Sequence, residues 1–350
     1  MDVIFSVDTG LLKSAFGKHI DPLKSVILRE SDLLEKRVDV VKGMFEIEKS
    51  THYGESYQVG AGIGEFMAIE EGGEPQNDGA EMIGDKFIAN IEFAKNIPLT
   101  RKAIINAKGP LAAGVKKLGT DMVGAWFKTR SHAASIALSN AEKATVNING
   151  TEVDLTTFDK LPLFSKSHKF GGKKIKGGTQ GNLFYLADGF DAFDSVSYLE
   201  DVFNEGSGRI RNMKAENGDV MGYTGDVVRI PGNQLKFEKA VRKMLGSEYA
   251  GAVENATMNT QSGKYSLFVD PYWITDHPVM DIMSKECSRA INGNIFQERT
   301  NLEVEMQKNK LNMDCIGYGS FGIGFGNYKH IVRIHFLDEE GTMPTAELLG

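Results

Sequence analysis

The chain has little cysteine, no long apolar run and no surplus of basic charge. Its 350 residues contain two cysteines, Cys287 and Cys315, which excludes a disulfide framework or a zinc cluster and favours a reducing compartment. No stretch approaches the ~18 consecutive apolar residues that a membrane-spanning helix requires. The first residues include Asp2 and Asp8 and hold no sustained apolar run, so we expect no signal peptide. These absences predict a soluble protein that is intracellular when it is made.

The acidic balance argues against a further class, the general polyanion binders. The formal net charge is −7 and the isoelectric point is near 5.6, whereas such proteins usually carry a basic excess. Hydrophobic residues make up 41% of the chain and charged residues 25%, which are ordinary values for a folded protein. A chain of this length is expected to form about two domains with a sizeable core.

The histidines do not form a recognisable site. His330 and His335 are five positions apart on a predicted strand, so their side chains should point to opposite faces and cannot share a metal. Asp276-His277 resembles two members of a catalytic triad, but Pro278 follows, which is typical of a turn that begins a helix.

The glycine-rich and serine motifs are also incomplete. The glycines of 60–64 are followed by no strand-to-helix turn, and Gly171-Gly172-Lys173-Lys174 lacks the spacing of a P-loop. Ser320 misses the nucleophile-elbow pattern by one position. The sequence therefore predicts no catalytic residue, no cofactor and no metal, and so no enzyme.

What the chain does contain is an acidic ribbon at 65–86. Its net charge is −6 out of the −7 of the whole chain, because seven acids accompany one base, Lys86. The acids are Glu65, Glu70, Glu71, Glu74, Asp78, Glu81 and Asp85. Residues of strand-like periodicity flank the ribbon on both sides, which predicts a long hairpin over about 45–97. A lone two-stranded hairpin is marginally stable in water, so this one needs a surface to lie on.

Two stretches without any acid could supply that surface on another copy of the chain. Six bases lie between Glu92 and Asp121, and six lysines lie between Asp159 and Asp188. Runs of charge are usually solvated surface, but opposite charges of this size also suit mutual docking, which sets register and partner choice. Binding of the ribbon to a different patch on the next copy is a heterologous interaction, which can close into a ring.

The predicted subunit-contact residues are the acids of the ribbon and selected bases of the two stretches. They are Glu65, Glu70, Glu71, Glu74, Asp78 and Glu81 with Arg101, Lys102, Lys166, Lys169, Lys173, Lys174 and Lys176. Contact of the lysines with nucleic acid is a second use, but no interleaved aromatic residues support base stacking.

Helix and strand signals alternate without a regular β-α-β rhythm, so the predicted class is α+β. In an N-terminal arm, Ser31 is expected to cap a short helix that ends at Gly43. Gly109-Pro110 predicts the start of a helix of ~30 residues that runs to about Asn140. Asn149-Gly150 predicts a tight hairpin. The other expected elements are helices near 190–203, 235–245 and 277–290, a strand at 265–269, and long strands after 301 whose glycines mark bulges or close backbone approach.

Three segments resemble a known family. LPLFSKSHKFGG followed by TQGNLF, over 161–184, is similar to a segment of Mu-like major head subunits. The segments GDVVRIPGNQLKFEKAVRKML, at 225–245, and KYSLFVDPYWITD, at 264–276, are similar to the following parts of the same subunits. With the order of parts, the chain resembles the major capsid proteins of tailed bacteriophages, which have the Hong Kong 97 phage-type fold.

The resemblance implies a division into an arm, a loop and two domains. Residues 1–44 would be the N-terminal arm, 45–97 the extended E-loop hairpin, 98–180 with 300–340 the peripheral domain with its long spine helix, and 181–299 the axial domain.

The resemblance also implies a function. Copies would assemble as hexamers and pentamers into an icosahedral viral head around double-stranded DNA, without sequence-specific binding and without a membrane. The implied partners are a separate scaffolding protein, a portal and a decoration protein, with assembly in the host cytoplasm and a final place in the virion. An encapsulin-type nanocompartment shell, and less so an enzyme with a mobile acidic lid, remain alternatives.

Overall fold

A computed structural model describes residues 4–7, 20–35, 39–60, 82–100, 111–170, 178–186, 193–246, 249–250, 257–258, 261–309 and 312–337. Contacts divide the chain into two units, which we treat separately. Unit 1 comprises Met1–Glu55, Ile88–Ala134 and Phe296–Ile323, and unit 2 comprises Ser56–Phe87, Ser135–Ile295 and Gly324–Gly350. Each unit contains helices and strands, so the predicted α+β class is confirmed. None of the helices described is long and apolar enough to cross a membrane.

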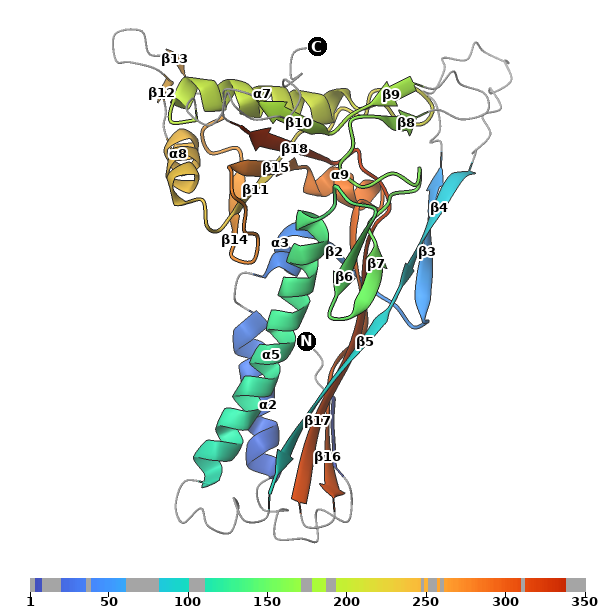
Figure 1. The fold of residues 1–350 in the computed structure, drawn as a ribbon, viewed down its shortest axis with the longest axis vertical. Helices are drawn as coiled ribbons and strands as arrows, with labels where there is room; N and C mark the ends of the chain where they lie inside the picture. Colours follow the sequence, from blue (N-terminus) through green and yellow to red (C-terminus); the bar gives the residue numbers. More distant parts are fainter. Residues whose placement is uncertain are drawn as a thin grey trace, which may run out of the picture. The chain divides into compact units, whose positions relative to one another are not determined.

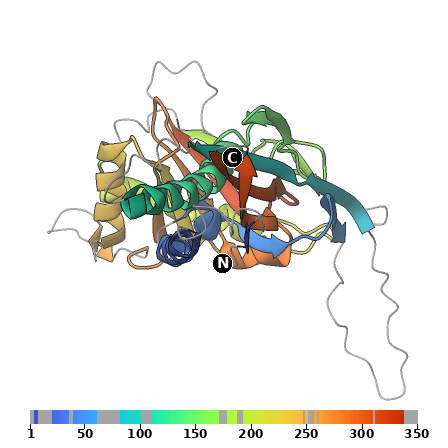
Figure 2. The same ribbon diagram turned by 90° about the horizontal axis from the view of Figure 1, so that it is seen from below.

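Unit 1 is built on one sheet with the strand order β1-β16-β17-β5, to which β2 adds by pairing with β16. The strands are β1 (Ile4–Val7), β2 (Glu46–Lys49), β5 (Ile91–Leu99), β16 (Asn294–Asn309) and β17 (Asn312–Phe325). Its helices are α2 (Ile20–Glu35), α3 (Val40–Met44) and most of α5 (Leu111–Ser139). Helix α2 lies beside α5 in both views (Figures 1 and 2).

The long helix predicted from residue 109 to about 140 is confirmed as α5. Its buried residue Trp126 contacts an aromatic cluster on the sheet, where the Phe93 and Phe321 rings stack with centroids 4.5 Å apart and Trp126 lies 5.6 Å from Phe321. A Cβ atom at Gly319 would overlap the Trp126 ring, so only glycine fits there. The prediction that this glycine marks a close approach is confirmed.

Unit 2 contains a five-stranded sheet of order β10-β18-β15-β11-β14. Its strands are β10 (Leu183–Leu186), β11 (Val227–Pro231), β14 (Ser266–Asp270), β15 (Val279–Met283) and β18 (Ile331–Phe336). The helices are α7 (Val196–Asn212), α8 (Leu235–Gly246) and α9 (Lys285–Ala290). Helix α7 packs on β15 and β18 (Figure 1).

Four two-stranded hairpins complete unit 2. They are β3 (Gly54–Gly60) with β4 (Met82–Ala89), β6 (Thr145–Ile148) with β7 (Thr151–Asp154), β8 (His168–Phe170) with β9 (Gly178–Gln180), and β12 (Tyr249–Ala250) with β13 (Thr257–Met258). The turn at Asn149-Gly150 has φ angles of 51° and 94°, as the predicted tight hairpin requires. The hairpin around the acidic ribbon is confirmed at its base by the pairing of β3 with β4, while residues 61–81 lie outside the described residues.

The strand-like periodicity after the ribbon, in which Phe87, Ala89, Ile91 and Phe93 alternate, does not form one strand, because the chain breaks between β4 and β5 at Asn90. The Asn90 backbone N–H donates to the Tyr53 carbonyl at 2.7 Å, and its amide donates to the His52 carbonyl at 2.9 Å. The alternation of apolar residues continues on both sides of the break, so the pattern alone did not reveal it. The second part, β5, pairs with β17 instead of β3.

Three helix predictions needed correction. Ser31 lies inside α2 and is not at the start of a helix; the nearby short helix is α3, whose N-cap is Asp39. The helix expected near 190–203 starts later, at Val196 after the cap Ser195. In the span 277–290, the apolar run 279–283 is the buried strand β15, and only α9 is helical. A short apolar run does not distinguish a strand from a helix by its period.

Candidate self-assembly surfaces

The only base of the acidic ribbon, Lys86, forms an ion pair within unit 2. The Lys86 Nζ lies 2.5 Å from the Asp154 Oδ2 and 3.2 Å from the Thr156 Oγ1, and the lysine side chain is buried. Burial lowers the pKa of Lys86, and the bond to Asp154 opposes that shift. The Lys86 ammonium is therefore paired with Asp154 within unit 2. Those acids, Glu65 to Glu81, lie outside the described residues.

Of the predicted basic contact residues, the structure describes Lys166 and Lys169, and both are exposed. The Lys166 Nζ lies 4.7 Å from the centre of the Tyr185 ring. The remaining five, Arg101, Lys102, Lys173, Lys174 and Lys176, lie outside the described residues. The docking role of the whole set stays a prediction.

Asp159 fixes the segment that carries Lys166 and Lys169. Its carboxylate pairs with the His168 Nδ1 at 2.9 Å and accepts from the Thr157 Oγ1 at 2.6 Å. Burial alone would raise the pKa of Asp159, but these interactions outweigh it and hold the pKa below its ordinary value. The His168 ring stacks on Tyr328 at a centroid distance of 3.7 Å. The two lysines thus extend from a well-anchored segment.

A row of buried charges crosses the sheet of unit 2. Arg229 on β11, Asp281 on β15 and Arg333 on β18 are successive cross-strand partners. The Asp281 carboxylate accepts from the Arg229 Nη1 at 2.9 Å and from the Arg333 Nε at 2.7 Å. Asp270 on β14 accepts from Arg229 at 2.6 Å. Two arginines and two aspartates balance in charge, which makes their burial tolerable.

The same row holds the C-terminal end of α5. The Arg333 guanidinium donates to the carbonyls of Leu138 and Ser139 at 2.9 and 3.0 Å. These carbonyls have no partner within the helix, and the positive charge also complements the negative end of the helix dipole. The Trp273 ring lies 4.2 Å from the Arg229 guanidinium and 4.9 Å from that of Arg333. We interpret the network as structural, because each of its charged side chains is paired with another charged side chain of the network.

A polar chain continues from the row to the surface. The Glu142 Oε1 lies 3.1 Å from the Arg333 Nη1 and 3.0 Å from the His335 Nε2. The His335 Nδ1 lies 2.8 Å from the His277 Nε2, and the His277 Nδ1 lies 2.7 Å from Asp276. Burial opposes ionisation of Glu142, but the hydrogen bond from His335 and the charge of Arg333 outweigh it and lower its pKa to about 2. Among the residues described, no three histidine, cysteine or acidic side chains are placed to hold a metal.

The Asp276-His277 pair of the sequence thus meets a second histidine, and strand β15 follows it instead of the expected helix. Ser320 is fully buried and its Oγ has no hydrogen-bond partner among the described residues. Burial also raises the pKa of the Cys287 and Cys315 thiols to about 12. None of these side chains is an exposed, activated nucleophile.

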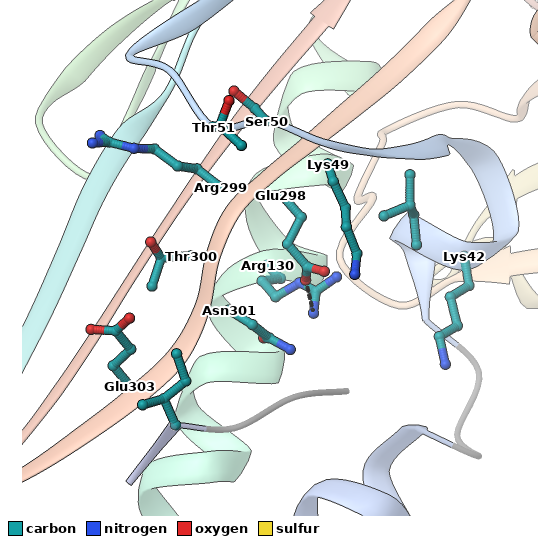
Figure 3. Close-up of a pocket in the computed structure, with 12 residues that line it drawn as sticks. Lys42, Lys49, Ser50, Thr51, Arg130, Glu298, Arg299, Thr300, Asn301 and Glu303 are labelled. Carbon is teal, nitrogen blue, oxygen red and sulfur yellow. Dashed lines mark ion pairs between the residues drawn. The ribbon is translucent and has the colours of Figure 1, made fainter. Parts of the chain in front are cut away.

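Unit 1 contains a cleft of about 480 Å³ (Figure 3). The charged residues that line it are Lys42, Lys49, Arg130, Arg299, Glu298 and Glu303. Arg130, on α5, is 3% exposed and lies 5.8 and 5.1 Å from the ring centres of Phe127 and Phe296. Its Nη1 lies 3.1 Å from the Glu298 carboxylate, while its Nε has no hydrogen-bond acceptor among the described residues. The cleft therefore has a buried positive charge in its wall.

Two exposed lysines add to that charge. In Figure 3, Lys49 of β2 lies beside the Arg130–Glu298 pair and Lys42 of α3 lies farther along the cleft. Arg299 points away from them and pairs with Glu92 at 3.4 Å. The lining of the cleft thus combines basic side chains with the carboxylates of Glu298 and Glu303.

The fold is shared with a phage capsid protein. No protein-family model matches the chain, and no curated protein matches it in sequence. A chain in the capsid structure of the cyanophage P-SCSP1u superimposes with a TM-score of 0.51 at 9% identity, covering 86% of this chain and 89% of that one. The fold is thus that of a tailed-phage major capsid protein, as the resemblance predicted.

Two other solved structures match with lower scores. The capsid of an empty GTA particle gives a TM-score of 0.48 at 13% identity over 86% of this chain and 91% of that one. A virus-like particle from Pyrococcus furiosus gives 0.45 at 11% identity over 90% and 98%.

Sequence reasoning missed the buried charged row and the Arg130 cleft. The row did leave a signal, because three of its four members interrupt a short apolar run: VVRIP for Arg229, VMDIM for Asp281 and IVRIHF for Arg333. A single charge in the middle of a buried strand calls for an opposite charge on the neighbouring strand. The cleft left no such signal, since its charged residues come from four separate elements, α3, β2, α5 and β16.

Proposed function

We propose that this chain is the major capsid protein of a tailed bacteriophage. Copies assemble as hexamers and pentamers into an icosahedral head that encloses double-stranded DNA. The observation that carries the proposal is the likeness of the fold, over most of both chains, to a chain of the cyanophage capsid structure. The role is structural, and the protein ends in the virion after assembly in the host cytoplasm.

The parts of the chain then take the roles expected of such a subunit. Residues 1–44 form the arm, 45–97 the E-loop, 98–180 with 300–340 the peripheral domain, and 181–299 the axial domain. A separate scaffolding protein, a portal and a decoration protein are the proposed partners. The acidic side chains of the ribbon, from Glu65 to Glu81, contact basic side chains of the next copy.

The charge of the chain supports a container. A net charge of −7 disfavours strong, salt-dependent contact with the phosphates of the packaged DNA. The buried arginines and aspartates of unit 2 form ion pairs with one another, so they are not available to bind a substrate.

Charge reversal in the ribbon tests the proposal. We expect the variant E70K/E71K/E74K to fold but to form no shells, because every copy in a shell uses the same heterologous interface and carries the same reversed charges. Particles are counted by electron microscopy and sedimentation, and folding is checked by circular dichroism. A control with the same change in charge is E152K/D201K/E305K, which alters three exposed acids outside the ribbon and should still assemble.

Two results would contradict the proposal. Wild-type protein that remains a monomer or dimer under all assembly conditions would favour an enzyme with an acidic lid. Particles that enclose a protein cargo and no DNA would favour the nanocompartment shell.

A further inference from the structure

Two histidines of unit 2 lie in line between two carboxylates. The His277 Nδ1 lies 2.7 Å from the Asp276 Oδ1, and the His277 Nε2 lies 2.8 Å from the His335 Nδ1. The His335 Nε2 lies 3.0 Å from the Glu142 Oε1. Each contact is short enough for a hydrogen bond, so every ring nitrogen of the two histidines takes part. We call these four residues the histidine bridge.

Both carboxylates of the histidine bridge are ionised near neutral pH. The hydrogen bond from His277 lowers the pKa of Asp276. At Glu142 burial opposes ionisation, but the hydrogen bond from His335 and the charge of Arg333 outweigh it and lower the pKa to about 2. The carboxylates therefore act as acceptors, and the protons of the bridge lie on the ring nitrogens.

The number of those protons follows from hydrogen-bond chemistry. A hydrogen bond needs one proton on one atom and a lone pair on the other, so the three contacts of the bridge need three protons. Two neutral imidazoles carry one proton each, and thus two in all. The complete bridge therefore contains one extra proton, and the pair of His277 and His335 carries one positive charge.

Any other number of protons breaks a contact. A fourth proton places N–H groups on both the His277 Nε2 and the His335 Nδ1, which then face each other without an acceptor. The two imidazolium rings also repel, since their centres are 5.1 Å apart. With only two protons, one of the three contacts has lone pairs on both sides and is not a hydrogen bond. The bridge is complete in one protonation state.

The surroundings leave this pair as the part that responds to pH near neutrality. Within the described part of the chain, the other charged or titratable side chains beside the bridge or its neighbours are Tyr185, Lys166, Arg333 and Asp281. The Tyr185 ring stacks on His335 at 4.9 Å, and burial raises its pKa, so it stays neutral. Arg333 is paired with Asp281 and Glu142. Histidine is the side chain whose charge ordinarily changes between about pH 5 and 8.

We propose that His277 and His335 share one extra proton and form a pH-sensitive latch, which fastens the loop before β15 to strand β18 and opens when a second proton binds. The second proton comes from solvent and binds the inner ring nitrogen that had accepted the hydrogen bond. His277 is the side that opens, because its side chain is 25% exposed and its partner Asp276 lies at the surface, whereas His335 is 9% exposed. The latch goes beyond the proposed capsid function and does not rest on it.

Nitrogen NMR of the histidine rings in the full chain counts the protons directly. Between about pH 6 and 8, we expect the rings of His277 and His335 to carry three protons together, with the outer nitrogens protonated and the inner pair sharing one. At lower pH, we expect a fourth proton and loss of the signal of the shared hydrogen bond. The variants H277Q and H335Q assign the signals.

A double-mutant cycle measures whether the two rings depend on each other. H277Q, H335Q and the double variant are unfolded with urea from about pH 4 to about pH 9, a range that brackets histidine titration. We expect the coupling factor in the unfolding constant to peak at about fivefold or more and to fall towards one on both sides. H52Q, which alters an exposed histidine outside the bridge, is the control and should show no coupling to H335Q.

A change of charge beside the bridge should move the peak. E142Q removes a carboxylate that favours the imidazolium, so we expect the maximum of coupling to move to lower pH by about one unit or more. E152Q removes the charge of an exposed acid outside the bridge and should leave the maximum in place.

Three results would overturn the inference. Coupling that does not vary with pH would show that the contact needs no extra proton. Coupling that grows steadily towards acid would show that each histidine pairs with its own carboxylate alone. Rings with one proton each throughout about pH 6–8 would exclude the shared proton. If the glutamine variants do not fold, the nitrogen spectrum of the wild type decides, and no outcome bears on shell formation.

Discussion

Two regions of helix α5 are held by different chemistry. In unit 1, the Trp126 face of α5 packs on stacked aromatic rings and on the bare backbone of Gly319. In unit 2, Arg229 and Arg333 hold the end of the same helix with buried charges. A change of shape in an aromatic core lowers the free energy of unfolding moderately. Removal of one partner from a buried ion pair lowers it more, because a buried charge is left without a counter-charge. The comparison predicts that single substitutions in the charged row do the most damage.

The largest expected effect is that of Asp281→Ala. It leaves Arg229 and Arg333 buried without the carboxylate between them, so we expect the free energy of unfolding to fall by about 3–5 kcal/mol. Urea unfolding measures this. The control is Glu238→Ala, which breaks an exposed pair with Arg242 and should cost less than about 0.5 kcal/mol. Equal losses of unfolding free energy in the two variants would show that the buried ion pairs contribute no more to stability than the exposed one.

An intermediate effect is expected in the aromatic core of unit 1. Gly319→Ala places a methyl group against the Trp126 ring, and we expect a loss of about 1–3 kcal/mol. Gly124→Ala is the matched control, since a Cβ on this helical residue meets nothing within 4 Å and should stabilise α5 by about 0.5–1 kcal/mol. Thermal unfolding of both variants checks the opposite signs. A stable Gly319→Ala protein would show that the helix moves away from the sheet easily.

The smallest effect depends on pH and concerns Glu142. Its folded pKa of about 2 lies below the ordinary value of 4.5, so its ionised form stabilises the folded state above pH 4.5. That contribution, about 1 kcal/mol after allowance for solvent near the carboxylate, disappears as the pH falls from 4.5 towards 2. Glu142→Gln should therefore lose stability at neutral pH and converge with wild type near pH 2. Parallel pH curves for the two proteins would contradict the assignment.

Local chemistry was enough to predict some elements. Asn149-Gly150 accepts positive φ at both positions, and α5 has a long helical period after Pro110. The base of the acidic hairpin could also be predicted from alternation. Boundaries failed where alternation continued through a break, as at Asn90, whose side chain binds the His52 carbonyl instead of extending the strand.

The sites were less predictable than the elements. The acidic ribbon is a property of composition, so it was visible in the sequence, and its docking role stays a prediction. The Arg130 cleft was not visible, because Lys42, Lys49, Arg130 and Glu298 are distant along the chain and meet only in the folded unit.

By itself, the sequence determined the distribution of charge, the long helix and the absence of a recognisable catalytic motif. Those properties depend on residue type and on spacing within a few turns or strands. The tertiary structure decided which charged side chains form ion pairs within the subunit. Lys86 and Arg333 are as basic as Lys49 in the sequence, but Asp154 and Asp281 occupy them in the fold. The electrostatic effect of a side chain depends on the charges close to it in space. Packing between segments that are distant in the sequence decides which charges those are.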